Sequence, residues 1–391
     1  MNKEIYIPQI LLDRLEERLA PGKVVVIYGP RRVGKTTLLR HFVSRRPEPS
    51  LVVTGEDIVV REYLESQSVA KLRAFVGNAS LLVVDEAQHA REIGLNLKLL
   101  VDHVPGLRVV ATGSSSFDLA QSAGEPLTGR KSTLLMLPPA QMEIGSLEAA
   151  HETRAALESR LIHGSYPEVV LMESQAERER YLRELVGAYL YKDILQYEDV
   201  RQPDKLGRLL QLLALQVGTE VSVTELGTSL GMSKNTVDRY LDLLAKVFVI
   251  YPRSGFSRNL RKEVTKSRRY YFFDNGIRNA LINRFAPLSM RDDVGALWEN
   301  YVVTERTKRH LYLDEPVQSA FWRTYDGQEI DLIEEAKDGL RGYEMKWSPG
   351  RRRSPPGAWR SAYPEAGYRV IHRDNYLEFI GAAPPQDDEG R

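Results

Sequence analysis

One stretch of this chain decides its fold: VVVIYGPRRVGKTTLLR, at residues 24–40. The four apolar residues 24–27 are typical of a buried parallel strand, and the leucine pair further on marks the apolar face of a helix. Between them, Gly29 and the triplet Gly34-Lys35-Thr36 reproduce the spacing G-x-x-x-x-G-K-[ST] in full. A strand, a glycine-rich loop and a helix in this order predict an α/β domain with a parallel sheet and a phosphate-binding loop.

Each residue type in the loop has a chemical reason to be there. The glycines let the backbone curl so that its N–H groups point at a β-phosphate, and the helix N-terminus adds partial positive charge. We expect Lys35 to contact the β- and γ-phosphate oxygens and the Thr36 hydroxyl to ligate Mg²⁺, so that ATP and Mg²⁺ are the predicted ligands. The expected nucleotide-binding residues are Gly29, Pro30, Arg31, Arg32, Val33, Gly34, Lys35, Thr36 and Thr37. The alternative is a basic turn before an ordinary helix.

A second apolar run, residues 81–84, ends in two carboxylates, Asp85 and Glu86. At the end of a parallel strand, Asp85 is expected to hold the Mg²⁺ through water, and Glu86 to orient and deprotonate the attacking water. A second acid at this place favours hydrolysis over simple nucleotide storage. The alternative is that the two acids merely end a strand.

A third apolar run, residues 107–112, ends in a glycine followed by three serines. A polar residue at the tip of this strand is placed to sense the γ-phosphate, and Thr112 and Ser114 are the candidates. A serine-rich turn without a role is the alternative reading.

These motifs resemble a large prokaryotic family of AAA-type ATPases that join this core to a C-terminal domain of unknown function. The resemblance covers about residues 10 to 380. The matching segments are residues 29–37, 84–88, 111–116, 127–130, 163–168 and 191–194. The resemblance implies a P-loop core, a small helical lid, a winged helix and a nuclease-like end. It also implies a homo-oligomer in which Arg130 is a catalytic arginine finger or lid sensor, acting in cis or in trans; an ordinary surface arginine is the alternative.

Length and composition fit a multidomain enzyme. A chain of 391 residues is too long for one core and predicts two or three domains. The absence of cysteine excludes disulfides and cysteine-ligated zinc and agrees with a reducing cytoplasm. No apolar run approaches the roughly 20 residues needed to span a bilayer, and the Met-Asn-Lys-Glu start is unlike a signal peptide. We therefore expect a cytoplasmic protein with no membrane partner.

Charge is distributed unevenly along the chain. The net charge is only +1, yet residues 201–285 hold 15 lysines and arginines against 7 acids. Seven of these basic residues crowd into residues 253–269 with a single acid between them. A basic run is usually a solvated face, so this feature alone leaves nucleic-acid binding open.

The segment before the basic run has the pattern of a helix-turn-helix. Residues 223–230 predict a short amphipathic helix, Gly231 the turn, and Ser233 the cap of a second helix over residues 234–246. Strand-like runs at 247–252 and 269–273 flank the basic run, which makes it the wing of a winged helix. The expected DNA-binding residues are Lys234, Asn235, Thr236, Arg239, Arg258, Arg261 and Lys262. Winged helices also serve as protein-interaction modules, and that alternative stays open.

Four residues near the C-terminus resemble the PD-(D/E)xK nuclease motif. Asp331 lies in a strand-like run, and Glu344 and Lys346 share one face of the next because side chains alternate along a strand. We expect Asp331 and Glu344 to hold a divalent cation and Lys346 to position the water, with Glu299 as an auxiliary acid on the preceding helix. Alternating charges on an exposed strand are the competing explanation.

These patterns predict the following organisation: an ATPase core over residues 1–140, a helical lid and connector over 141–203, a winged helix over 204–285, a restriction-nuclease-like α/β domain over 290–380 and a disordered tail over 381–391. Three functions then compete. The first is an ATPase that remodels or moves along DNA, including branched or structured DNA. The second is an ATP-regulated nuclease, and the third is a nucleotide switch that binds a protein partner.

Overall fold

The computed structural model describes residues 6–113, 127–187, 202–257, 268–350 and 354–382. The chain forms two compact units, and each is described by itself. The N-terminal unit comprises residues 9–138 with 246–248, and the C-terminal unit comprises residues 1–8, 139–245 and 249–391. In the described ranges, no helix is long and apolar enough to cross a membrane.

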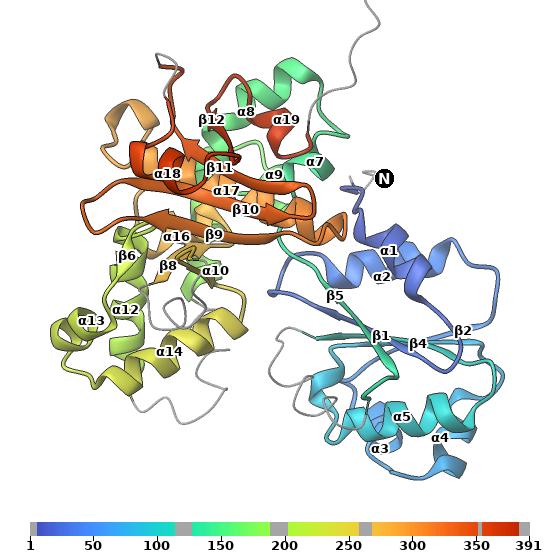
Figure 1. Ribbon diagram of the computed structural model, residues 1–391. Helices are drawn as coiled ribbons and strands as arrows, with labels where there is room; N and C mark the ends of the chain where they lie inside the picture. The colour runs from blue at the N-terminus through green and yellow to red at the C-terminus, as the bar shows by residue number, and fades with distance from the viewer. Residues whose placement is uncertain (1–5, 114–126, 188–201, 258–267, 351–353, 383–391) are drawn as a thin grey trace, which may run out of the picture. The chain divides into compact units, whose positions relative to one another are not determined.

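The N-terminal unit is built on a parallel sheet of five strands in the order β2-β3-β4-β1-β5. The strands are β1 (Val24–Tyr28), β2 (Ser50–Thr54), β3 (Leu81–Asp85), β4 (Arg108–Gly113) and β5 (Lys131–Leu135). The helices are α1 (Leu11–Arg18), α2 (Lys35–Ser44), α3 (Ile58–Leu64), α4 (Val69–Val76) and α5 (Ile93–His103). Helices α1 and α2 cover one face of the sheet, and α3, α4 and α5 cover the other (Figure 1). The predicted α/β fold with a parallel sheet is therefore confirmed.

This strand order explains both the composition of the strands and the position of the site. All five residues of β1 are buried, because the strand lies between two neighbours and under helices on both faces. The strands are parallel, so the loops after β1, β3 and β4 leave from the same edge of the sheet. In open α/β sheets this edge is where ligands bind.

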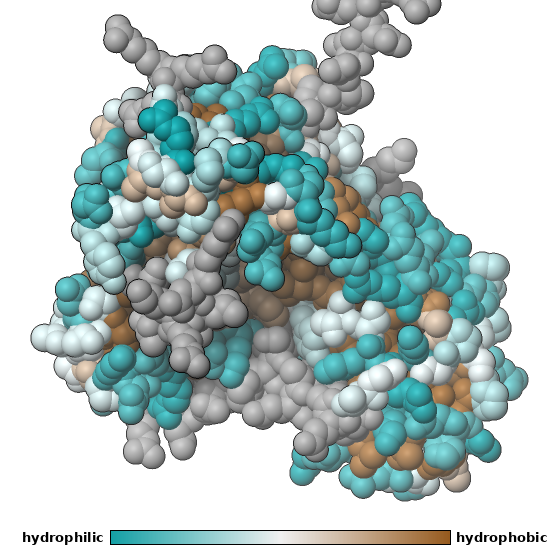
Figure 2. Space-filling model, viewed as in Figure 1, coloured by the Kyte–Doolittle hydropathy of each residue, from teal (hydrophilic) through white to brown (hydrophobic). Residues whose placement is uncertain are grey.

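Among the described residues of this unit, apolar side chains on β2 and α3 reach solvent. Val52 on the edge strand β2, and Ile58 and Val59 on α3, are 50%, 66% and 56% exposed. Brown, hydrophobic atoms interrupt the hydrophilic surface around α3 in Figure 2. This edge of the unit is therefore less polar than most of its surface.

The C-terminal unit begins with helices. They are α7 (Gln141–Ile144), α8 (Ala150–His163), α9 (Pro167–Leu171), α10 (Gln175–Leu185) and α12 (Pro203–Leu215). Helix α8 packs against α16 (Asn275–Leu281), and α10 contacts both of them. The helices before residue 186 therefore share a core with a helix nearly 100 residues later in the sequence.

A three-stranded antiparallel sheet and two helices follow. The sheet has the order β6-β8-β7, formed by Glu220–Val221, Arg268–Phe272 and Ile250–Ser254. Helices α13 (Val223–Leu230) and α14 (Lys234–Lys246) lie between β6 and β7 in the sequence. Gly231, at φ 60°, ends α13 in the left-handed conformation that glycine adopts at helix ends.

The last part of the chain contains a mixed four-stranded sheet in the order β12-β11-β10-β9. Its elements are η3 (Leu288–Met290), α17 (Val294–Tyr312), β9 (Gln318–Arg323), β10 (Glu329–Ala336), β11 (Gly339–Met345), α18 (Gly357–Ala362), β12 (Gly367–Ile371) and α19 (Tyr376–Phe379). Strands β9, β10 and β11 are antiparallel, and β12 is parallel to β11. Helix α17 contacts β11 of this sheet and β8 of the three-stranded sheet, so it joins the two.

Candidate functional site

The loop after β1 has the backbone that a phosphate-binding loop requires. Gly29 approaches the chain so closely that a Cβ there would lie 1.9 Å from the carbonyl oxygen of Met136. Arg32 has φ 63° and Gly34 has φ 99°, and α2 begins at Lys35, directly after Gly34. A glycine-containing loop of this kind ahead of a helix N-terminus can direct its backbone N–H groups at an anion.

The lysine of the loop is buried, at 5% exposure, and its position is fixed by the loop itself. Its Nζ donates to the carbonyl oxygens of Gly29 and Pro30, both at 2.9 Å. Thr36 is half-buried beside it, whereas Arg32 and Thr37 are exposed. The ammonium group is therefore held inside the curl of the loop, where a phosphate group would meet it.

The acid at the end of β3 links the loop to β4. One oxygen of Asp85, Oδ2, accepts a hydrogen bond from the Thr36 hydroxyl at 2.6 Å, and the other, Oδ1, accepts one from the Thr112 hydroxyl. The two expected Mg²⁺ ligands, Thr36 and Asp85, thus already face each other. Thr112 is completely buried and also accepts a hydrogen bond from the backbone N–H of Glu86 at 3.0 Å. One hydroxyl therefore anchors both acidic residues.

Glu86 has an unusual backbone for a residue that is not glycine. Its φ is 49°, in the left-handed region, and its Oε2 accepts a hydrogen bond from Gln88 Nε2 at 2.5 Å. Gly55, after β2, lies so close that a Cβ there would be 2.5 Å from the Glu86 carbonyl oxygen. Uncommon backbone conformations of this kind concentrate at functional sites. Gln88 and Gly55 had no role in the sequence interpretation, although Gln88 lies inside one of the family motifs.

Two further residues, Ser114 and Arg130, were expected at the nucleotide site. Ser114 lies outside the residues that the structure describes. The carbonyl oxygen of Arg130 accepts a hydrogen bond from the N–H of Val24, the first residue of β1. The phosphate loop begins at the opposite end of β1, after its last residue, Tyr28. Four residues of strand separate these ends, about 13 Å. Arg130 Nε instead pairs with Asp102 at 2.8 Å, so in this conformation Arg130 does not complete the site of its own chain.

The expected DNA-binding residues fall into two groups. Lys234, Asn235 and Arg239 are exposed and Thr236 is half-buried at the start of α14, where the Thr236 N–H donates to Ser233 Oγ at 3.2 Å. The other three, Arg258, Arg261 and Lys262, lie outside the described residues.

The structure also corrects the interpretation of the basic run. Arg253 and Arg269, at its two ends, are buried at 6% and 3% exposure, so they do not belong to a solvated basic face. Both are held by protein groups, and the Arg253 guanidinium donates to Thr307 at 2.9 Å.

Arg269 contacts two of the residues expected at the nuclease-like site. Its Nη1 lies 3.6 Å from Glu299 Oε1 and 3.8 Å from Asp331 Oδ1, and its Nη2 lies 2.8 Å from Glu329 Oε2. The Tyr271 hydroxyl donates to Glu299 at 2.7 Å. Burial, and then the charge of Asp331, raise the pKa of Glu299 to about 8. The guanidinium therefore lies beside a crowded group of acids.

The remaining two residues of the nuclease-like motif pair with each other. Lys346 Nζ and Glu344 Oε1 are 2.6 Å apart, while the Asp331 carboxylate accepts the N–H of Met345 at 2.7 Å. Burial, followed by the charge of Glu344, raises the pKa of Asp331 to about 6. Across the described part of the chain, no group of three or more histidines or acids is arranged to hold a metal ion. The divalent cation expected between Asp331 and Glu344 stays a prediction.

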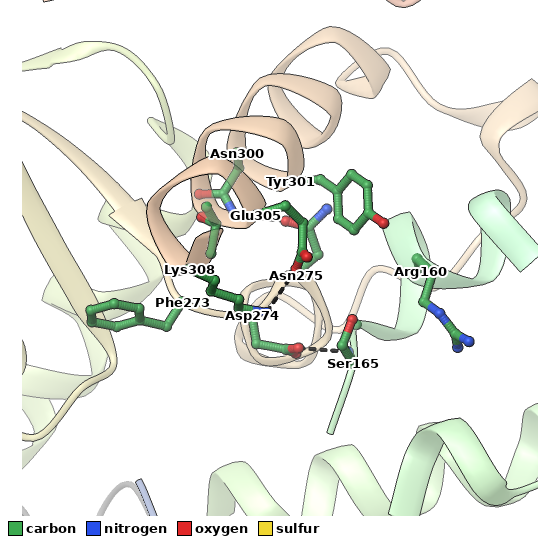
Figure 3. Close-up of a pocket in the computed structure, with 11 residues that line it drawn as sticks. Arg160, Ser165, Phe273, Asp274, Asn275, Asn300, Tyr301, Glu305 and Lys308 are labelled. Atoms are coloured by element: carbon green, nitrogen blue, oxygen red, sulfur yellow. Dashed lines mark hydrogen bonds and ion pairs between the residues drawn. The ribbon is translucent and has the colours of Figure 1, made fainter. Parts of the chain in front are cut away.

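A polar pocket inside the C-terminal unit was not foreseen from the sequence. Residues from α8, from the segment before α16 and from α17 meet around it (Figure 3). The buried Asp274 carboxylate accepts the N–H of Ser165 at 2.7 Å, and Lys308 pairs with Glu305 at 2.7 Å. Burial raises the pKa of Asp274 to about 6. The only signal in the sequence was the motif at residues 163–168, which supplies Ser165.

Residues 21–145 match the family model of an AAA domain. This part of the chain is therefore similar to AAA-type ATPase domains. Residues 154–288 and 294–382 match two models described as domains of unknown function, DUF8612 and DUF4143. These matches support the predicted combination of an AAA-type ATPase with C-terminal domains of unknown function, and a domain of this type implies the ability to bind a nucleotide. The winged helix and the nuclease-like fold stay predictions.

Similar proteins occur in distant organisms. An uncharacterized protein of Mycobacterium tuberculosis is 29% identical over 353 residues, which cover 89% of this chain and 74% of that protein. An uncharacterized protein of Methanocaldococcus jannaschii is 22% identical over 366 residues, 85% of this chain and 80% of its own. Among solved structures, the Holliday junction branch migration motor RuvB of Thermotoga maritima is 16% identical over 64% of this chain and 90% of its own, with a TM-score of 0.30.

Proposed function

We propose that this protein is a Mg²⁺-dependent ATPase that binds DNA and couples ATP hydrolysis to remodelling of the DNA or movement along it. The observation that carries the ATPase part is the assembly of Thr36, Asp85 and Thr112 beside the phosphate loop. The proposed Mg²⁺ ligands Thr36 and Asp85 lie within hydrogen-bond distance of each other, and the proposed base Glu86 follows Asp85 directly; preorganisation of this kind is what catalysis requires.

The proposed chemistry assigns one task to each residue. Lys35, held inside the loop, neutralises charge on the β- and γ-phosphates. Thr36 and Asp85 hold the Mg²⁺, which neutralises further charge on the phosphates when it is bound. Glu86 accepts a proton from the water that attacks the γ-phosphorus, and its carboxylate is oriented by Gln88. Ser114 remains a candidate γ-phosphate sensor.

The DNA part of the proposal is supported by the elements around α14. A helix, a glycine turn and a second helix, followed by two antiparallel strands, have the order of a winged helix. Lys234, Asn235 and Arg239 are exposed at the start of the second helix, where a recognition helix contacts DNA. Arg258, Arg261 and Lys262 are proposed to contact phosphates from the wing, independently of sequence.

A protein-binding switch is the second candidate, and one observation favours it. Burial of Arg253 and Arg269 removes two of the seven basic residues from the surface of the proposed wing. A smaller basic surface weakens the case for phosphate contacts and suits a protein partner better. In either case we propose a homo-oligomer, in which Arg130 acts on the site of a neighbouring subunit.

DNA stimulation of ATP turnover separates the two candidates. The assay compares turnover without DNA and with single-stranded, duplex and branched DNA, and it follows the length of the DNA in the same tubes. Stimulation by any of the three supports the DNA proposal. Unchanged turnover, together with no measurable DNA binding at low salt, would replace it with the protein-binding switch.

The salt dependence of DNA binding tests which residues make the contacts. Neutralising Arg258, Arg261 and Lys262 together is expected to flatten the slope of log K against log salt by about 2.7, since each phosphate contact contributes about 0.9. The control neutralises three exposed arginines elsewhere, Arg91, Arg154 and Arg180, and is expected to keep the parental slope.

A further inference from the structure

An arginine side chain lies among the acids of the nuclease-like motif. We infer that the Arg269 guanidinium occupies the place where a nuclease of the PD-(D/E)xK type would bind its divalent cation, so that this chain binds no metal there and does not cleave DNA with it. The inference does not depend on what the ATPase domain does.

The Arg269 guanidinium lies beside the carboxylates of this site. Nη1 of Arg269 lies 3.6 Å from Glu299 Oε1 and 3.8 Å from Asp331 Oδ1, so it faces both the auxiliary acid and one of the two expected metal ligands of this site. A divalent cation binds carboxylate oxygens at about 2.0–2.6 Å. Such an ion therefore has to displace the guanidinium before it can contact both acids.

Strand pairing and an aromatic ring hold Arg269 in place. It lies on β8, the central strand of its sheet, opposite Glu220 of β6 and Arg253 of β7. Its guanidinium stacks on the Phe321 ring at 4.6 Å and is only 3% exposed. The backbone, the ring and the contacted carboxylates thus fix one side-chain position, which a flexible surface arginine would not have.

Protein groups surround the Glu299 carboxylate. The Tyr271 hydroxyl donates to its Oε1 at 2.7 Å. Gly218, at φ +76°, brings the main chain so close that a Cβ there would lie 3.0 Å from the same oxygen. This oxygen is therefore already surrounded by protein groups, and water ligands of a metal ion would have little space.

The experiment is Mn²⁺ binding to the full chain without nucleotide, measured by calorimetry. Arg269→Ala is expected to bind one more Mn²⁺ per chain than the parent, because it leaves Glu299 and Asp331 without their cation. The additional site is expected to disappear when Asp331→Asn is added. Arg253→Ala is the matched control. Arg253 is also a buried arginine and pairs with Arg269 across the two strands, but its guanidinium donates to Thr307.

Two results would overturn the inference. One is folded Arg269→Ala protein, with parental circular dichroism, that binds no additional Mn²⁺. The other is parent protein whose Mn²⁺ stoichiometry falls by one on Asp331→Asn alone, because the site would then hold metal with Arg269 present. The second measurement does not require the Arg269 variant to fold.

Discussion

Replacing Thr112 by valine tests whether the two acids after β3 depend on one buried hydroxyl. Valine keeps the shape of threonine but removes the group that donates to Asp85 and accepts from the Glu86 N–H. A hydrogen bond to a charged group contributes about 1.5–3 kcal/mol, and a buried N–H left without a partner costs about 1–3 kcal/mol. Because the two contributions share one side chain, we expect a total loss of about 3 kcal/mol.

Thr112→Ser is the matched control, because it keeps the hydroxyl and removes one methyl group from a completely buried position. Burial of one such group contributes about 1 kcal/mol. The two variants should therefore differ by about 2 kcal/mol. The measurement is native-state hydrogen exchange at the amides of β3 and β4, since a chain of two units need not unfold in a single step.

Turnover gives a second, functional readout of the same change. With its anchor lost, Glu86 is no longer held at the attacking water, and a misplacement of about 1 Å can cost about 100-fold in rate. We expect the valine variant to lose about 10- to 100-fold in kcat and the serine variant less than about threefold. Equal exchange rates and equal kcat in the two variants would refute the role assigned to the hydroxyl.

The other predictions concern both units. Lys35→Ala should abolish tight nucleotide binding, whereas Glu86→Gln should bind ATP normally and stop turnover; hydrolysis at the parental rate by Glu86→Gln would assign the base to another group. Burial, followed by the charge of a nearby arginine, lowers the pKa of His163 to about 4, so stability present above the unfolded pKa of about 6.5 is lost as the pH falls toward 4. Between pH 7.5 and 5 the free energy of unfolding should fall by about 2 kcal/mol more in the parent than in His163→Phe, and parallel pH profiles in urea unfolding would contradict this. Gly164→Ala should lower the free energy of unfolding of its unit by about 2–4 kcal/mol in the same assay, because a Cβ there would lie 2.1 Å from a buried carboxylate oxygen. Gly295→Ala is the control and should not destabilise the unit, because a Cβ at that position would have no atom within 4 Å.

Local signals explain which elements could be predicted from the sequence. Helices at 223–230 and 234–246 were predicted with the bounds that the structure has, because Gly231 between them and Ser233 before the second are strong end signals. The phosphate loop was recognisable because its chemistry fixes both residue type and spacing. Strands β2, β5, β6 and β12 were not identified, and all four lie at sheet edges. Edge strands carry a weaker apolar pattern than central ones.

The side chains whose positions could not be predicted depend on contacts that are distant in the sequence. Arg269 belongs to a basic run, and nothing near it indicates that its side chain meets acids that follow 30 and 62 residues later. Arg130 was assigned to the site from its motif, but its place at the far end of β1 follows from the register between β1 and β5. Register of parallel strands is a property of the whole sheet, and no local pattern specifies it.

The close approach of Gly29 to Met136 has a mechanical consequence. The N–H of Met136 donates to the Tyr28 carbonyl oxygen at 2.7 Å, and the space between Gly29 and the Met136 carbonyl cannot hold even a methyl group. Two residues after Met136, the chain leaves the N-terminal unit. A displacement of the loop toward this segment on binding phosphate would therefore push directly on the chain's exit from the unit. The conformation of the nucleotide loop and the start of the connecting peptide are therefore coupled by direct backbone contact.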